Sequence, residues 1–145
     1  MKNIILLLSL IMVFSCNKES SPESSLENLV SMRFDGSSRS EILEIVTGKL
    51  HDQISNMSEE NIKLFLENEG LRNRGLTITL KNCEGTKCYL TYILKYNDER
   101  PQGTTFKVEV KKIAQIDLIE GEWLISDISN VKTYIDSKKE IKTQE

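Results

Sequence analysis

The spacing of apolar residues changes near Gly75 and divides the chain into a helical half and a stranded half. Before this point apolar residues recur every three or four positions, which is the period of a helix with one buried face. After it they alternate with polar residues, which is the period of a half-buried strand. The pattern therefore predicts helices first and an antiparallel sheet afterwards.

Three helices are predicted, over residues 25–35, 38–54 and 58–69. Ser24 or Ser25 caps the first. The second begins at Ser38 and Glu41, whose side chains can satisfy each other's free backbone amides. Gly48 falls inside this second helix and costs about 1 kcal/mol there relative to alanine. We read it as a site of close packing or as a kink.

Four strands are predicted, and turn residues separate them. They cover residues 76–81, 88–96, 104–119 and 122–129, with residues 131–135 continuing the last one along the sheet edge. Leu76, Ile78 and Leu80 share one face of the first strand. The third strand is long, and Lys111 and Lys112 interrupt its alternation, which indicates a bulge or bend near Lys111.

Composition and charge describe an ordinary globular domain. Of the 145 residues, 39% are hydrophobic and 28% are charged, and the full chain has 19 Lys and Arg against 22 Asp and Glu. A chain of this length can bury a stable core without disulfides or bound metals. The slightly acidic balance argues against a nucleic-acid partner.

The N-terminus has the three parts of a secretory signal: a positive start at Lys2, an apolar run over residues 4–14, and the small residue Ser15. The run is shorter than the ~20 residues that a transmembrane helix needs. Its ending, Val13-Phe14-Ser15-Cys16, resembles the lipobox of bacterial lipoproteins, although Phe14 is bulkier than the usual residue there. This resemblance implies alkylation of the Cys16 thiol with diacylglycerol, cleavage just before Cys16 and frequent acylation of the new amine, with palmitate as a typical acyl chain.

The expected organisation is a signal peptide over residues 1–15, a lipidated Cys16 with a tether to residue 25, a domain over residues 26–135, and a disordered tail over residues 136–145. Asn17 after the cysteine favours the outer membrane over the inner membrane, by resemblance to enterobacterial sorting. A secreted protein with an incidental cysteine after its signal is the alternative.

Cys83 and Cys88 flank a four-residue loop with Gly85 and are predicted to form a disulfide at a hairpin tip. Lipidation of Cys16 leaves an even pair in an oxidising compartment. Free thiols remain one alternative. A metal or redox site is another, although C-x4-C offers too few ligands for a metal, and redox motifs usually have the spacing C-x-x-C.

The segment 108–128, VEVKKIAQIDLIEGEWLISDI, resembles the last two strands of small bacterial lipoproteins of the DUF4878 kind, in the NTF2-like, cystatin-like superfamily. This resemblance covers residues 24–135. It implies an α+β domain in which N-terminal helices pack on a curved antiparallel sheet that closes into a cone. Tyr92, Tyr96 and Trp123 are then the candidates to line a pocket in the mouth of the cone, with core packing the favoured interpretation of Trp123.

No catalytic constellation is visible in the sequence. His51 is the only histidine, and we interpret it as a solvated or boundary residue rather than a general base. We therefore expect no catalytic residue, no metal and no cofactor. The favoured hypothesis is a lipid-anchored, non-catalytic binding module with a membrane contact and an envelope protein partner. The alternatives are a small enzyme that uses the cone, and an immunity or exclusion lipoprotein.

Replacement of Cys16 by alanine tests the anchor. Cys16→Ala is expected to abolish metabolic labelling with a radioactive fatty acid and to release the protein from the membrane fraction, because a thioether to lipid requires the thiol. Fractionation of cells that express either form provides the measurement. Unchanged membrane retention of the variant would contradict lipid anchoring.

Overall fold

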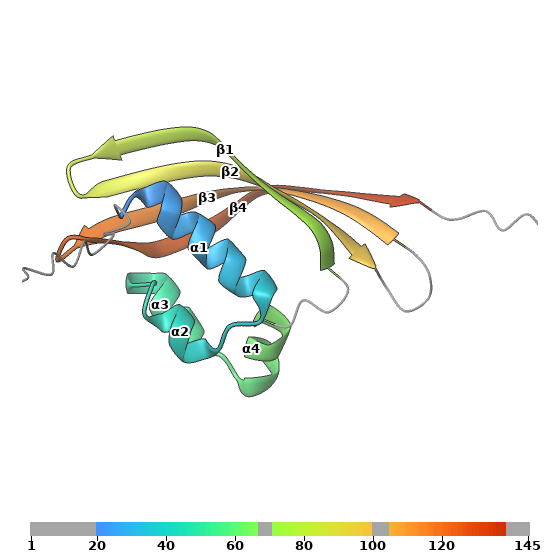
Figure 1. Ribbon diagram of the computed structural model, residues 1–145, viewed down its shortest axis with the longest axis horizontal. Coiled ribbons are helices and arrows are strands. Elements are labelled where there is room, and N and C mark those ends of the chain that lie inside the picture. The colour runs from blue at the N-terminus through green and yellow to red at the C-terminus, as the bar shows by residue number, and fades with distance from the viewer. Residues whose placement is uncertain (1–19, 67–70, 100–104, 139–145) are drawn as a thin grey trace, which may run out of the picture.

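The computed structural model describes residues 20–66, 71–99 and 105–138 as four helices followed by four strands (Figure 1). The helices are α1 (Pro22–Asp35), α2 (Arg39–Leu43), α3 (Gly48–Ser55) and α4 (Glu59–Leu66). The strands are β1 (Leu71–Glu84), β2 (Lys87–Glu99), β3 (Thr105–Ile119) and β4 (Glu122–Lys138). The expected signal peptide, Cys16 and residues 139–145 of the expected tail lie outside the described residues.

The strands form an antiparallel meander in the order β1-β2-β3-β4. Gly85 at φ 57° and Gly121 at φ 88° occupy the two described turns, where a side chain would be strained. All four helices lie on one side of the sheet, and β2, β3 and β4 extend beyond them at one end (Figure 1). We call the covered side the helix face and the other side the outer face.

The prediction of an NTF2-like or cystatin-like cone is wrong. The sheet is open, because β1 and β4 form its two edges and do not pair with each other. The motif that suggested the cone occupies the β3–β4 hairpin. Alternating apolar residues and a turn glycine such as Gly121 occur in any half-buried hairpin. Such a local pattern carries no information on whether the sheet closes.

The core lies between the helices and the helix face of the sheet. In β2 the alternate residues Cys88, Leu90, Tyr92 and Leu94 are buried, which confirms the predicted alternation of this strand. The most deeply buried core residues, each at most 1% exposed, are Leu26, Leu29, Ile42, Ile54, Cys88, Leu90, Ala114, Ile116 and Ile125. One helical stripe per helix and one strand face therefore suffice for the core.

The predicted helix over residues 38–54 is interrupted. The Thr47 N–H donates to the Ile125 carbonyl at 2.9 Å, and the Ile125 N–H donates to the Ile45 carbonyl at 3.1 Å. Val46 thereby forms a parallel bridge with Ile125 on β4. Gly48 begins α3 at φ 52°, so it permits a sharp turn rather than lying in a continuous helix. Hydrogen bonds to a distant strand outweigh the local helical period.

Several boundaries also differ from the predicted ones. Helix α1 begins at Pro22 with Ser21 as its N-cap, so it includes residues 22–25 that were expected to be tether. Strand β2 runs to Glu99 into the predicted turn, and β4 runs to Lys138 into the predicted tail. The irregularity expected near Lys111 is present, but the extra residue belongs to β4 and not to β3.

A left-handed turn at Gly48 and a continuous helix through it predict opposite effects of alanine at this position. Because the φ of Gly48 is left-handed at 52°, which strains any residue with a Cβ, Gly48→Ala is expected to lower the free energy of unfolding by about 1–2 kcal/mol. In a continuous helix the same change would raise it. Urea denaturation measures the difference. Gly75→Ala is the control, since an added Cβ there meets no atom within 4 Å, and it is expected to cause no loss.

Candidate functional site

The three aromatic residues predicted to line one pocket are in three different environments. Tyr92 on β2 is 2% exposed and belongs to the core. Tyr96, four residues along the same strand, packs edge to face on Phe34 of α1 with ring centroids 5.7 Å apart. Trp123 is at the start of β4 and lines a separate pocket. The expected aromatic pocket is therefore absent from the described residues.

The buried tyrosines lie beside cationic side chains at the α4 end of the core. Burial raises the pKa of Tyr92 to about 12, and the positive charge of Arg33 opposes this effect. Burial also raises the pKa of Tyr96 and lowers the pKa of Lys112, which is opposite Tyr92 in the sheet. The Arg33 guanidinium stacks over the Phe65 ring at 4.1 Å. Tyr92 is therefore protonated at neutral pH and serves packing.

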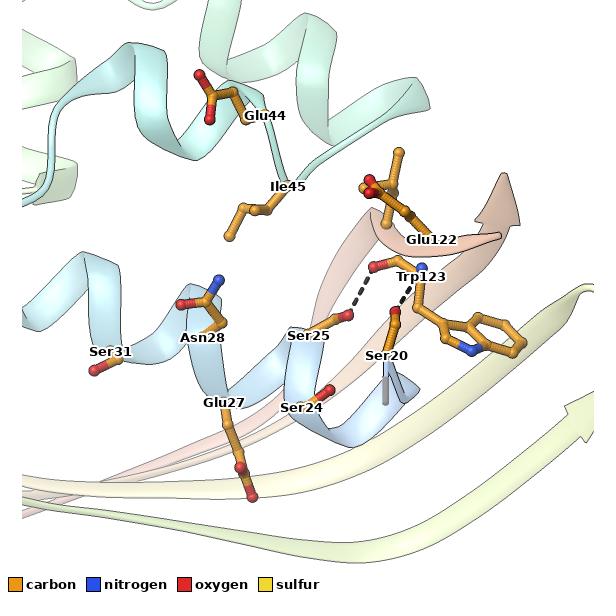
Figure 2. A pocket seen from close by; sticks show the side chains of 11 residues that line it. Ser20, Ser24, Ser25, Glu27, Asn28, Ser31, Glu44, Ile45, Glu122 and Trp123 are labelled. Atoms are coloured by element: carbon orange, nitrogen blue, oxygen red, sulfur yellow. Dashed lines mark hydrogen bonds between the residues drawn. The ribbon is translucent and has the colours of Figure 1, made fainter. Parts of the chain in front are cut away.

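A cavity of about 510 Å³ lies between α1, the segment after α2 and the start of β4 (Figure 2). Its lining is rich in hydroxyl and carboxylate groups and consists of Ser20, Ser24, Ser25, Glu27, Asn28, Ser31, Glu44, Ile45, Glu122, Trp123 and Leu124. This lining includes no histidine, cysteine or cationic side chain. The indole of Trp123 points away from Asn28 and Ser31 (Figure 2).

The serines of this cavity already hold the structure together. The Ser25 hydroxyl donates to the Trp123 carbonyl at 2.7 Å, and the Trp123 N–H donates to Ser20 Oγ at 3.3 Å. Ser24 and Ser21 exchange the hydrogen bonds of a capping box at the start of α1. These bonds fix α1 to β4. Ser31, another serine of the lining, donates to the Asp35 carboxylate at 2.7 Å and accepts from the Arg74 guanidinium at 3.2 Å.

A second hollow of about 610 Å³ lies on the sheet beyond the helices. Lys95 and Glu109 form an ion pair across β2 and β3 at 2.9 Å, and Tyr134 of β4 follows in the same row of side chains. Lys107 and Asp136 form the next row. This region is a charged part of the outer face.

The outer face also exposes apolar side chains on three neighbouring strands. Leu80 of β1 is 62% exposed, Tyr89 of β2 is 43% exposed and Ile113 of β3 is 36% exposed. Leu80 and Ile113 lie on either side of Thr91 in one row, and Tyr89 is in the adjacent row. We call Leu80, Tyr89 and Ile113 the outer-face patch. An exposed apolar cluster on a sheet typically marks a contact surface.

Sequence reasoning missed this patch because it placed Leu80 with Leu76 and Ile78 on one face. A register shift between Ile78 and Leu80 moves Leu80 to the opposite face of the sheet. The apolar character of Tyr89 and Ile113 was visible, but alternation does not show which face the helices cover.

His51 is on α3 with its side chain 44% exposed, and its Nδ1 atom is 3.6 Å from an oxygen of the neighbouring Asp52. The described residues contain no group of three His, Cys, Asp or Glu side chains that could hold a metal ion. Among the described helices, none is sufficiently long and apolar to traverse a bilayer. These observations add no catalytic candidate.

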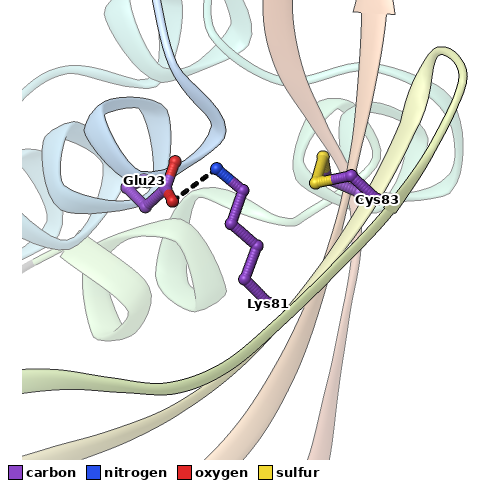
Figure 3. The surroundings of a disulfide bond; sticks show 4 residues. Glu23, Lys81 and Cys83 are labelled. Atoms are coloured by element: carbon purple, nitrogen blue, oxygen red, sulfur yellow. Dashed lines mark hydrogen bonds and ion pairs between the residues drawn. A yellow bond between two sulfur atoms is a disulfide. The ribbon is translucent and has the colours of Figure 1, made fainter.

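The two cysteines of the β1–β2 hairpin are opposite each other, with Cα atoms 4.0 Å apart and their sulfur atoms bonded. Nearby, Lys81 of β1 pairs with Glu23 of α1 at 2.6 Å (Figure 3). The hydrogen bond from Lys81 lowers the pKa of Glu23. This end of the hairpin is therefore fixed both to itself and to α1.

Comparison with known proteins gives a likeness of fold. No family model and no curated protein matches the chain. The chain resembles the solution structure of a SEC-C motif containing protein from Rhodopseudomonas palustris, with a TM-score of 0.57 and 13% sequence identity over 77% of this chain and 80% of that one. At this identity the likeness concerns the fold alone.

Loss of the disulfide between Cys83 and Cys88, by mutation or by a reductant, tests whether it stabilises the protein. Because the disulfide closes a short loop, the variant with Cys83→Ala and Cys88→Ala is expected to lose about 2 kcal/mol in free energy of unfolding. A thiol reductant should destabilise the native protein and leave the variant unchanged, which separates the loss of the bond from the loss of the buried Cys88 side chain. Equal urea midpoints of the native protein with and without reductant would contradict the pairing.

Proposed function

We propose that the protein is a lipid-anchored binding module of the bacterial cell envelope. In this proposal Cys16 carries the lipid, the outer membrane is its favoured site, and the folded domain contacts another envelope protein without catalysing a reaction. The proposal draws on the lipobox-like sequence before Cys16 and on the geometry of the sheet.

The position of the first described residues supports a domain close to its anchor. Ser20 contacts Trp123 at the start of β4, and α1 begins two residues later. Four residue steps separate Cys16 from Ser20, and an extended chain spans at most about 14 Å over that length. A lipid on Cys16 would therefore hold the end of the domain that carries the β3–β4 turn near the bilayer surface.

The observation that carries the binding proposal is the outer-face patch. The helices cover only one side of the sheet, and Leu80, Tyr89 and Ile113 stay exposed on the other side. Lys95, Glu109 and Lys107 provide charged groups farther along the same face. An apolar centre with tyrosine and a charged surround is the composition typical of a protein contact surface.

The structural roles of the candidate catalytic side chains favour binding over catalysis. Ser24 and Ser25 of the cavity beside α1 form a cap and a backbone contact. Ser31 is held by Asp35 and Arg74, which form an ion pair with each other. Tyr92 is packed in the core with a raised pKa. His51 is on α3, whereas the outer-face patch is on the strands. The best support is therefore for recognition by a surface.

Photo-crosslinking from single positions tests this function. A benzophenone amino acid is placed at position 89 or 113 of the full chain, which is expressed in cells of its native host. Each position is expected to give one adduct, and the two adducts should have the same size. The same probe in place of Leu64, which is 73% exposed on α4, is the matched control and is expected to give no such adduct. Adducts are separated by gel electrophoresis and identified by mass spectrometry.

Two further results decide the proposal. Combination of the probe at position 89 with Cys16→Ala is expected to abolish the adduct, because the domain is then no longer held at the membrane. Adducts of equal yield from positions 64, 89 and 113, or none from 89 and 113, would contradict recognition through the outer-face patch.

A further inference from the structure

The outer edge of β4 is covered at its start and open over the rest of its described length. Residues 45–47 bond to the Ile125 backbone on this edge, and Ser20 and Ser25 bond to the Trp123 backbone. Beyond Ile125, no described segment other than β3 pairs with the backbone of β4. Val131, Tyr134 and Ile135 on the open part are 51%, 50% and 65% exposed. An exposed edge of this kind is a template for another strand.

The hydrogen-bonding direction of this edge follows from the pairing of β3 with β4. Ile125 directs its N–H and C=O groups away from β3, and it is opposite Ile116. Ile116 therefore directs its own N–H and C=O groups away from β4. Because these directions alternate from residue to residue along β3, Val110 and Val108 also direct their N–H and C=O groups away from β4. Their partners on β4 are Thr133 and Ile135, whose N–H and C=O groups therefore point to the open side.

We propose that this edge pairs with the same edge of a second copy in antiparallel register, with Tyr134 on the twofold axis. Thr133 of each copy is then opposite Ile135 of the other, and each such pair exchanges two hydrogen bonds. Tyr134 is opposite Tyr134 in the close, non-hydrogen-bonded spacing. The result is an eight-stranded sheet with both helix layers on one face.

Charge complementarity selects this register. Lys132 of one copy is opposite Asp136 of the other, twice in the dimer. Within one chain Lys132 is opposite Lys111, an unfavourable pair of like charges on two exposed residues. Asp136 of the second copy supplies the missing negative charge. A register centred on Ile135 would instead place Asp136 opposite Tyr134 and separate it from Lys132, so the charges disfavour it.

The proposed dimer is weak and elongated. One strand pair covers less surface than the roughly 1,200 Å² of a standard stable complex, so the dimer is expected at high local concentration. The antiparallel arrangement places the two Ser20 ends at opposite ends of the joined sheet. Both chains can therefore be attached to one membrane when the strands run along its surface.

Disulfide trapping tests the register. In the full chain with Cys16→Ser, purified in detergent, Tyr134→Cys is expected to form a covalent dimer on mild oxidation. Lys132→Cys is the matched control, because position 132 of the second copy lies four residues along the strand, ~13 Å away. Non-reducing gel electrophoresis measures the yield. Absence of a Tyr134→Cys dimer, or equal yields at the two positions, would overturn the proposal.

Charge exchange provides an independent test that needs no new cysteine. Asp136→Lys is expected to weaken association in sedimentation experiments about fivefold or more, and addition of Lys132→Asp to the same chain should restore it. The two single variants, mixed, should associate better than either alone, since both cross-strand pairs are then attractive. Circular dichroism controls for folding. Unchanged association of Asp136→Lys, or no recovery in the double variant, would contradict the register.

Discussion

The short backbone pairing between residues 45–47 and Ile125 is the constraint on which the rest of the structure depends. It ends α2, sets the turn at Gly48 and directs α3 along β4, where Lys49 pairs with Asp127 at 3.0 Å. It also covers the start of the β4 edge. These bonds satisfy the backbone N–H and C=O of Ile125 on the side away from β3. They hold the helices over one face of the sheet at this end, and the far part of the β4 edge stays open.

This one-sided cover accounts for the surfaces that the proposals use. An antiparallel sheet needs only one buried face, so the other face can carry exposed residues without loss of the core. The outer-face patch occupies the middle of that face, and the open edge of β4 lies beside it. Pairing of two edges would extend the outer face into one continuous surface, so recognition and self-association are compatible in the same molecule.

The parts of the fold that depend on local patterns were predictable. The period of β2 placed Leu90, Tyr92 and Leu94 on the buried face, and the interruption at Lys111 located a real register shift. The parts that depend on distant partners were not. Alternation assigned Leu80 to the wrong face because a shift in pairing leaves no trace in the residue types. Likewise, an aromatic pocket was inferred from Tyr92, Tyr96 and Trp123, whose environments depend on how the helices pack.

The amino-acid sequence by itself determined the order and type of the elements, the Gly85 and Gly121 turns, and the chemistry on which the proposed anchor at Cys16 depends, since each of these follows from residues close together in the chain. Only the tertiary structure decided that the sheet is open, which face the helices cover and where the edge of β4 is free. These features arise from hydrogen bonds and packing between residues as far apart as Thr47 and Ile125. Closure, burial and edge pairing are properties of pairs of segments, and a local period describes only one segment at a time.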